Sequence, residues 1–299
     1  MPATMCDLAT KLPLLIGGLL DRESKLKKGR FREETMTDIL TGALAAFAGP
    51  NLVIEYPPEA VTGGDIDLRF WHVADAEEVH VRLQAKRLNA EMDGKRKRKV
   101  QHRSYEHLLH RPNSTAPYQF RTLESSPYPW VPLYMFYNHL SVVNDMHFKG
   151  TTPTVSGVNL AFAKDVAEQL ELKVAGATAA AKKVIHNQRL SHLRKNFFEL
   201  DAILCPAGDW NGEEVPPPSL VAASLSERYE EFIKINDLDA DDALFRILTK
   251  PGRLQVALNA PRRLGNGPAV RINQTLERPV VTLISGRTDA APTITGGPT

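Results

Sequence analysis

Two neighbouring stretches of the sequence place acidic, amide and basic side chains at alternate positions. Polar residues alternate with apolar ones in residues 65–70 and again in residues 79–87. A period of two is typical of half-buried strands, because successive side chains point to opposite faces of a sheet. Residues 74–77 fit a short turn between the two strands. We therefore expect a hairpin with one apolar face and one face that carries Asp65, Asp67, Gln84 and Lys86.

Those side chains suit the hydrolysis of a phosphodiester. The reaction needs an attacking water, neutralised phosphoryl oxygens and a stabilised leaving oxygen, and one or two divalent cations can supply most of this. Magnesium prefers oxygen ligands, often one or two carboxylates with water and substrate phosphate. Asp65 offers a carboxylate, Gln84 a side-chain carbonyl oxygen and Ala85 a backbone carbonyl oxygen. The pattern therefore indicates a candidate metal site with a lysine beside it.

Lys86 and Asp67 each have more than one role open to them. Lys86 could orient or help to deprotonate the attacking water, or place a charge on the scissile phosphate. Asp67 could bind a second metal ion or simply hold Arg82 or Arg69. A purely structural interpretation also exists: a salt-bridged sheet surface in which Asp67 pairs with Arg82 and Asp65 with Lys86.

A strongly helical segment precedes the hairpin. Apolar residues recur at three- and four-residue intervals over residues 31–47, and Gly49-Pro50 ends the run. Glu33 falls on the apolar stripe of this helix and Glu34 falls at its margin. A carboxylate on an apolar face needs a partner or a metal ion to offset its desolvation. The alternative is that both are first-turn glutamates, which the helix dipole favours.

The most basic segment of the chain follows the second strand. Its cations are Lys86, Arg87, Lys95, Arg96, Lys97, Arg98, Lys99 and Arg103. Such a run is usually a solvated loop or helix face. Because it lies directly after the candidate site, it could also neutralise phosphates along a polyanion. We expect Arg87 and the cations at 95–99 to contact nucleic acid.

The composition is that of a globular protein without a membrane segment. The chain has 299 residues, 42% of them hydrophobic and 24% charged, with a formal net charge of +2. The apolar run at 12–20 is too short to span a bilayer. Cys6 and Cys205 offer neither zinc-type spacing nor a disulfide framework. This pattern fits a reducing compartment, so we expect a soluble, cytoplasmic protein.

The chain divides at a proline-rich stretch. Residues 208–219 form the best candidate boundary, which predicts a domain over 1–210 and an extension over 220–286. The extension could complete the sheet, form an oligomer interface or sense a ligand. The Pro/Gly/Thr-rich residues 287–299 are typical of a disordered tail. Further patterns predict strands over 130–138, 200–205 and 278–284, and helices over 159–172, 175–198 and 220–235.

These motifs together resemble the PD-(D/E)XK nuclease superfamily. Its pattern is a helix bearing Glu, then Gly-x-Asp at the start of a strand, then (Asp/Glu/Gln)-x-Lys on the next strand. Residues 63–65 and 84–86 match the last two parts. The Gln-Ala-Lys-Arg form is most similar to the Mrr-type branch, in which glutamine replaces the usual acid. Residues 132–138 match a Pro-Leu-Tyr-x-Phe-Tyr-Asn strand of one bacterial group in this superfamily, so the resemblance covers roughly residues 20–205.

The resemblance implies both a fold and an activity. The fold is α/β, a restriction-endonuclease-like mixed β-sheet flanked by helices. The cofactor is Mg²⁺ or Mn²⁺, with Asp65 and Gln84 as ligands, Lys86 as the catalytic lysine, and Glu33 or Glu34 at the helix position. The implied activity is a metal-dependent DNA endonuclease in prokaryotic defence against foreign DNA, and we expect a homo-oligomer. Alternatives are a ribonuclease of the same fold and a catalytically silent nucleic-acid-binding module.

One feature departs from the acidic form of the motif. The neutral Gln84 leaves the site with fewer negative charges to hold a cation. Metal affinity would then depend on Asp67 or on a helix glutamate.

Overall fold

One mixed β-sheet forms the centre of the structure, which is a computed structural model. It describes residues 4–23, 31–57, 65–89, 103–111, 113–175, 177, 188–212, 214–236, 243–249, 252–253 and 268–286. The strands run in the order β10-β1-β11-β2-β3-β5-β6-β8, and β9 pairs with β3. Their bounds are β1 (Leu52–Tyr56), β2 (Ile66–His72), β3 (Glu77–Arg87), β5 (Trp130–Tyr137), β6 (Val158–Phe162), β8 (Phe198–Glu199), β9 (Gly252–Arg253), β10 (Ala269–Ile272) and β11 (Val280–Ser285). A separate ribbon pairs β4 (Ser104–Tyr105) with β7 (Gln188–Arg189).

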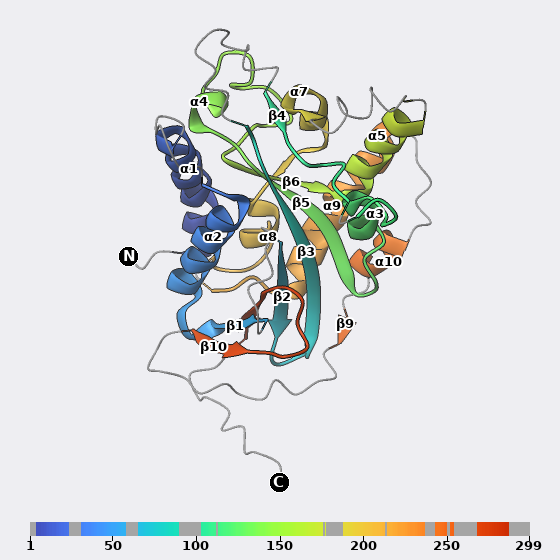
Figure 1. Cartoon of the computed structure of the whole chain (residues 1–299). Helices are drawn as coiled ribbons and strands as arrows, with labels where there is room; N and C mark the ends of the chain where they lie inside the picture. The colour runs from blue at the N-terminus through green and yellow to red at the C-terminus, as the bar shows by residue number, and fades with distance from the viewer. Residues whose placement is uncertain are drawn as a thin grey trace.

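Helices cover both faces of the sheet. They are α1 (Met5–Glu23), α2 (Glu33–Ala48), α3 (Gln119–Glu124), α4 (Leu140–Val143), α5 (Ala163–Ala175), α7 (Leu190–Leu193), α8 (Asp201–Leu204), α9 (Pro218–Asn236) and α10 (Ala243–Thr249), with 3-10 turns η1 (Gly49–Asn51) and η3 (Arg194–Asn196). Figure 1 shows the sheet between α1 and α2 on one side and α3 and α5 on the other. The predicted α/β class is confirmed: a mixed sheet flanked by helices, consistent with a restriction-endonuclease-like fold.

Two apolar cores fix these layers because β3 and β5 alternate between them. Leu83 and Ala85 of β3 pack in one core with α1, α2 and α9. Tyr134 and Phe136 of β5 pack in the other with α5. Strands with apolar residues on both faces are typical of the buried centre of a layered α/β protein.

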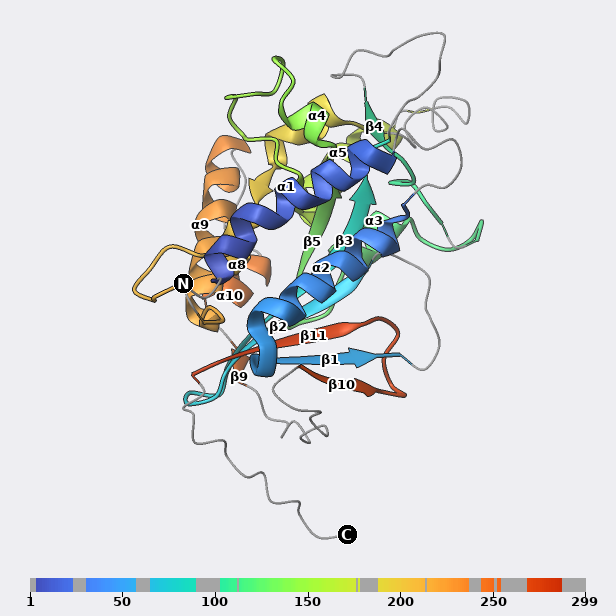
Figure 2. The same cartoon turned by 90° about the vertical axis from the view of Figure 1, so that its left-hand side faces the viewer.

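The C-terminal part of the chain completes the centre of the sheet. β11 lies between β1 and β2, antiparallel to β1 and parallel to β2. Figure 2 shows β11 beside β1 and β10, with α1 and α2 lying across the strands. Residues far beyond the proline-rich stretch therefore position the strand that follows Asp65.

Several of the other expected elements were wrong. Residues 200–205 form the short helix α8 rather than a strand, since a short apolar run has no periodicity that separates the two. The helix expected over 159–172 begins only at Ala163, because 158–162 is the fully buried strand β6. Residues 188–198 form β7, the one-turn helix α7, the 3-10 turn η3 and the start of β8 rather than the end of a long helix, and 178–187 lie outside the described residues.

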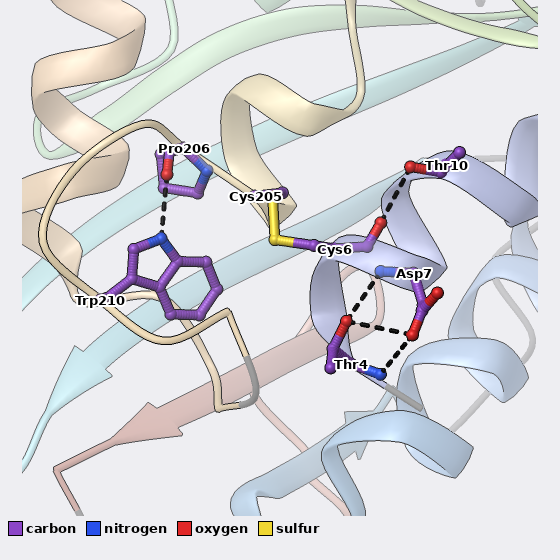
Figure 3. The surroundings of a disulfide bond; sticks show 7 residues. All are labelled: Thr4, Cys6, Asp7, Thr10, Cys205, Pro206 and Trp210. Carbon is purple, nitrogen blue, oxygen red and sulfur yellow. Dashed lines mark hydrogen bonds between the residues drawn. A yellow bond between two sulfur atoms is a disulfide. The ribbon is translucent and has the colours of Figure 1, made fainter. Parts of the chain in front are cut away.

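The expectation of two unpaired cysteines was also wrong. Cys6 of α1 and Cys205 at the end of α8 form a disulfide across 199 residues of chain (Figure 3). Sequence spacing could not reveal the bond, because it depends on α1 packing against α8. The disulfide removes the cysteine argument for a reducing compartment.

Thr4 and Asp7 cap the start of α1 reciprocally, with Asp7 N–H donating to Thr4 Oγ1 at 3.0 Å and Thr4 N–H to Asp7 Oδ2 at 3.1 Å.

None of the helices in the described ranges has the length and apolar character needed to cross a bilayer.

Candidate functional site

The predicted hairpin is formed, and its register places the polar residues on one face. Asp67 lies opposite Arg82, and Ile66 lies opposite Leu83. Side chains alternate between the faces of a strand, so residues 65 and 67 share a face with residues 82, 84 and 86. The first turn of α2 lies at the end of this hairpin where β2 begins and β3 ends.

Lys86 is buried beside a glutamate from α2. Its side chain is 5% exposed, and its Nζ lies 3.5 Å from Glu33 Oε2. The backbone N–H of Arg87 donates to Glu33 Oε1 at 3.2 Å. Glu33 therefore occupies the helix position beside the lysine. The side chain of Glu34, half-buried in the same turn, makes no hydrogen bond or ion pair with the parts of the chain that the structure describes.

The backbone carbonyl of Ala85 points toward the edge of β3 that faces the start of β2. Leu88 N–H donates to Tyr137 of β5, so the even residues at this end of β3 direct their backbone groups to β5. The odd residues direct theirs to the opposite edge. Arg87 N–H follows this rule, because it bonds Glu33 rather than β5. The carbonyl of Ala85 therefore points to the region next to Asp65, where β2 has not yet begun.

Gln84 carries a buried acceptor without a partner. The residue is 3% exposed, and its Oε1 has no hydrogen bond with any described residue. The hydroxyl of Tyr134, opposite Gln84 on β5, also lacks a partner within the described ranges. An unsatisfied buried polar atom costs about 1–3 kcal/mol. Such an atom is open to a water molecule, an ion or a ligand.

Asp65 is a carboxylate whose charge is only partly compensated. Burial raises its pKa above the usual range, and the nearby charge of Asp67 adds to this. Lys86, Arg278 and a hydrogen bond from Gln84 act in the opposite direction without cancelling the effect of burial. The Arg278 guanidinium is 3.9 Å from Asp65 Oδ2, which is too long for a direct hydrogen bond. A cation that arrived at Asp65 would stabilise its ionised form.

Asp67 is fully engaged with Arg82. Arg82 donates two hydrogen bonds to its carboxylate, at 3.0 and 2.8 Å, and lies 4.7 Å above the Trp130 ring. The alternative in which the hairpin is only a salt-bridged sheet surface is therefore correct for Asp67, which pairs with Arg82. For Asp65 and Lys86 the ion pairs are with Arg278 and Glu33, at 3.9 and 3.5 Å, although the charge of Lys86 still lowers the pKa of Asp65.

The oxygen donors around Asp65 suit magnesium, although Asp65 is the only one of them that carries a negative charge. Asp65 supplies one carboxylate, while Gln84 Oε1 and the Ala85 carbonyl supply neutral oxygens. Magnesium is often held by one or two carboxylates, with waters and substrate phosphates completing the shell. Within the described ranges, no group of three or more His, Cys, Asp or Glu side chains is arranged to hold a metal ion. The basic run at 95–99 lies outside the described residues.

Two residues near the site escaped the sequence interpretation. Arg278 lies 213 positions after Asp65 and approaches it only because β11 enters the sheet beside β2. The only sequence feature that could have pointed to Arg278 is its position as a single arginine directly before a strongly apolar strand. Tyr134 lies within an aromatic run that is otherwise core, and only its register opposite Gln84 distinguishes it.

Comparison with known proteins gives a family but no function. The sequence pattern of a family of unknown function, DUF6615, matches residues 5–289. No curated protein and no solved structure matches the chain.

Proposed function

The chain belongs to this family, DUF6615, whose description implies no activity. From the residues of the hairpin we propose that the protein is a divalent-metal-dependent nuclease that hydrolyses DNA. The observation that carries the proposal is the meeting of Asp65, the unpartnered Gln84 Oε1 and the buried Lys86 at one end of a hairpin. A carboxylate, neutral oxygens and an ammonium group are the parts that hydrolysis of a phosphodiester requires. The resemblance to PD-(D/E)XK nucleases supports the same activity.

Each residue has a role in the proposed mechanism. Asp65, Gln84 Oε1 and the Ala85 carbonyl would hold the metal ion. Bound there, magnesium or manganese would neutralise charge on the phosphoryl oxygens and help to generate the attacking hydroxide. Lys86 positions the attacking water and places a positive charge beside the scissile phosphate. Glu33 holds the lysine ammonium in place, since it is the partner of Lys86 on α2.

Gln84 would change its hydrogen bonding when the site is filled. It now donates to Asp65 from its amide nitrogen, which leaves Oε1 without a described partner. Rotation of the amide by half a turn would exchange these two atoms and direct Oε1 to the region beside Asp65. This needs no movement of the backbone.

A catalytically silent nucleic-acid-binding module is the second candidate. The observation that favours it is the single uncommitted carboxylate at the site, since Glu33 is paired with Lys86 and Asp67 with Arg82. Such a module would bind DNA without any dependence on a divalent cation. The wider setting, a homo-oligomer acting in prokaryotic defence against foreign DNA, belongs to the proposal through the resemblance alone.

The test is cleavage of supercoiled plasmid by the purified protein with magnesium, with manganese and with EDTA. We expect cleavage with either metal, none with EDTA, and a loss of at least about 100-fold in Lys86→Ala. Lys149→Ala is the matched control, because Lys149 is an exposed lysine remote in sequence from the hairpin. Cleavage by Lys86→Ala at the wild-type rate would overturn the site assignment.

A single-stranded RNA of matched length runs beside the plasmid. Faster cleavage of RNA would identify a ribonuclease that uses the same residues. Binding of DNA with an unchanged affinity in EDTA, and no cleavage of either substrate, would support the silent module instead.

A further inference from the structure

A patch of unpaired hydrogen-bonding groups lies on the same face of the sheet as the hairpin site. Its four atoms are buried and have no hydrogen-bond partner among the described residues: Arg69 Nε, Trp71 Nε1, His80 Nδ1 and Thr282 Oγ1. A native fold holds few such atoms, because each is costly when it is taken out of water without a partner. Four of them in one place are open to a ligand that satisfies them together.

The register of three neighbouring strands brings these side chains together. Thr282 of β11 lies opposite Arg69 of β2, and Arg69 lies opposite His80 of β3. Neighbouring strands are about 5 Å apart, so the three residues form a row across the sheet. Trp71 is two residues beyond Arg69 on β2 and therefore shares its face, as Asp65 does on the other side. The patch is built on strands of the central sheet rather than on loops.

The patch is composed mainly of hydrogen-bond donors. The Nε of an arginine and the Nε1 of a tryptophan can only donate, and a threonine hydroxyl can turn to donate as well. Thr282 is 0% exposed, so its hydroxyl depends on a partner within the protein or on a ligand. His80 can add a further donor when its ring is protonated. These groups require a ligand with several acceptor atoms, and a phosphate group has this property.

The patch also has a positive charge without a counter-charge. The described carboxylates on this part of the face each have a basic partner: Asp67 has Arg82, Glu78 has His80 and Glu55 has Arg271. The guanidinium of Arg69 forms no ion pair with these carboxylates, and its Nε has no described acceptor. Arg69 and Trp71 are half-buried rather than fully buried, so the patch reaches the surface. An anion bound there would offset the desolvation of Arg69.

We propose that Arg69, Trp71 and Thr282 bind a backbone phosphate of the nucleic acid that is cleaved at the hairpin site. Arg69 is four residues beyond Asp65, which is about 13 Å along an extended strand. Successive phosphates of one strand of B-form DNA are about 3.4 Å apart along its axis, so a duplex engaged at Asp65 reaches the patch about four nucleotides away. Arg69 neutralises the phosphate, while Trp71 and Thr282 donate hydrogen bonds that orient it. For the kind of ligand the proposal rests on the proposed function, and it is tested without cleavage.

The first test is binding of a fluorescent duplex oligonucleotide to the full chain in EDTA. Arg69→Gln should weaken binding and reduce the slope of log K against log salt concentration by about 0.9, the value for one phosphate contact. Arg228→Gln is the matched control, because Arg228 is exposed on α9, and α9 packs on the other face of the sheet with Leu83. Equal slopes in the wild type and Arg69→Gln, or no binding of the duplex, would overturn the proposal.

Thr282→Val separates a ligand contact from a structural one. It removes a buried hydroxyl that has no partner, so the free protein should keep at least the thermal stability of the wild type. Binding of the duplex should fall by about tenfold, because a hydrogen bond to a charged group is lost. Thr41→Val is the control with the opposite behaviour, since the Thr41 hydroxyl donates to the Thr37 carbonyl at 2.9 Å. It should lower the unfolding temperature and leave binding unchanged. Duplex binding at the wild-type affinity in Thr282→Val would contradict the assigned contact.

Inorganic phosphate is the second ligand, because it offers the same acceptor oxygens. Thermal stabilisation by phosphate that needs Arg69, with duplex binding that does not, would overturn the assignment to nucleic acid in favour of a small anion. The result is also separate from nuclease activity. Duplex binding that needs Arg69 in a protein that cleaves nothing would support this site and refute the nuclease, whereas cleavage by a protein whose binding is indifferent to Arg69 would do the reverse.

Discussion

The two ends of one face of β3 differ in how well their polar groups are satisfied. At the N-terminal end, Asp67 accepts two good hydrogen bonds from Arg82. His80 Nε2 lies 2.7 Å from Glu78 Oε2, while its Nδ1 is buried without a partner among the described residues. At the C-terminal end, Gln84 Oε1 has no described partner. Asp65 has Arg278 at 3.9 Å and the charge of Lys86 nearby, and together they do not cancel the effect of its burial on its pKa. Both ends are buried and rich in charge, so composition does not separate them.

The difference indicates which charges stabilise the fold and which are held for a ligand. A pair with good geometry needs nothing more, and removing one member leaves the other as an uncompensated buried charge. A carboxylate with a raised pKa beside an unsatisfied amide is stabilised only when a cation or donor arrives. Asp65 and Asp67 are two residues apart and share one face of the hairpin, so substitutions at these two positions can be compared directly.

The largest expected effect is on catalysis at Asp65. Asp65→Asn should reduce plasmid cleavage in magnesium by at least about 100-fold, because it removes the only carboxylate proposed to bind the ion. Asp67→Asn should leave the rate within about threefold of wild type in protein shown to be folded, since Asp67 is committed to Arg82. Gel-based initial rates measure both. Equal losses in the two variants would remove the distinction between the two ends.

For the free energy of unfolding, we expect the larger effect at Asp67 and the smaller one at the end of the face that holds Asp65 and Gln84. Asp67→Ala should lower the free energy of unfolding by about 2 kcal/mol, because it removes two charge-assisted hydrogen bonds from the half-buried Arg82. Gln84→Leu should change it by less than about 1 kcal/mol, since the loss of the hydrogen bond to Asp65 is offset by removal of the unsatisfied buried Oε1. Urea unfolding followed by circular dichroism measures both. A larger loss in Gln84→Leu would mean that its amide is structurally committed.

The sequence was sufficient to predict the hairpin and its two faces. Strict alternation over 65–70 and 79–87 specifies the register, because a slip of one residue would move the charged side chains into the apolar core on the other face. It also predicted α2 and the strand at 130–138, both of which have strong patterns. It could not separate Asp65 from Asp67. That difference depends on Arg278, brought in by β11, and on the geometry of Arg82 above Trp130.

Short elements and contacts between distant residues could not be predicted from the sequence. The apolar run at 200–205 is too brief for its period to be read, and it became α8 because it packs against α1 and α9. The bond between Cys6 and Cys205 is a consequence of that packing. A local pattern therefore identifies strands and faces, whereas the set of partners at the site is determined by the topology.

A smaller effect should separate the two glutamates of α2. Glu33→Gln should slow cleavage by about tenfold, because Lys86 loses the charged partner that holds its ammonium at 3.5 Å. Glu34→Gln, one residue along the same turn, should leave the rate unchanged. Equal rates for the two variants would mean that Glu33 only caps the end of β3.

The smallest expected effect is a gain of stability in Asp65→Asn. Folding raises the pKa of this carboxyl, mainly through burial, so the folded state holds the proton more tightly than the unfolded chain does. The ionised carboxyl therefore costs stability once the pH rises through its folded pKa, and costs nothing below its ordinary pKa. Asp65→Asn should accordingly be slightly more stable than wild type at pH 7, with the difference disappearing as the pH falls toward 3. Thermal unfolding across this range, with Asp67→Asn as the control that loses stability at pH 7, measures the sign. A less stable Asp65→Asn at pH 7 would show that Lys86 and Arg278 compensate Asp65 fully, and the two ends of the face would then be equivalent.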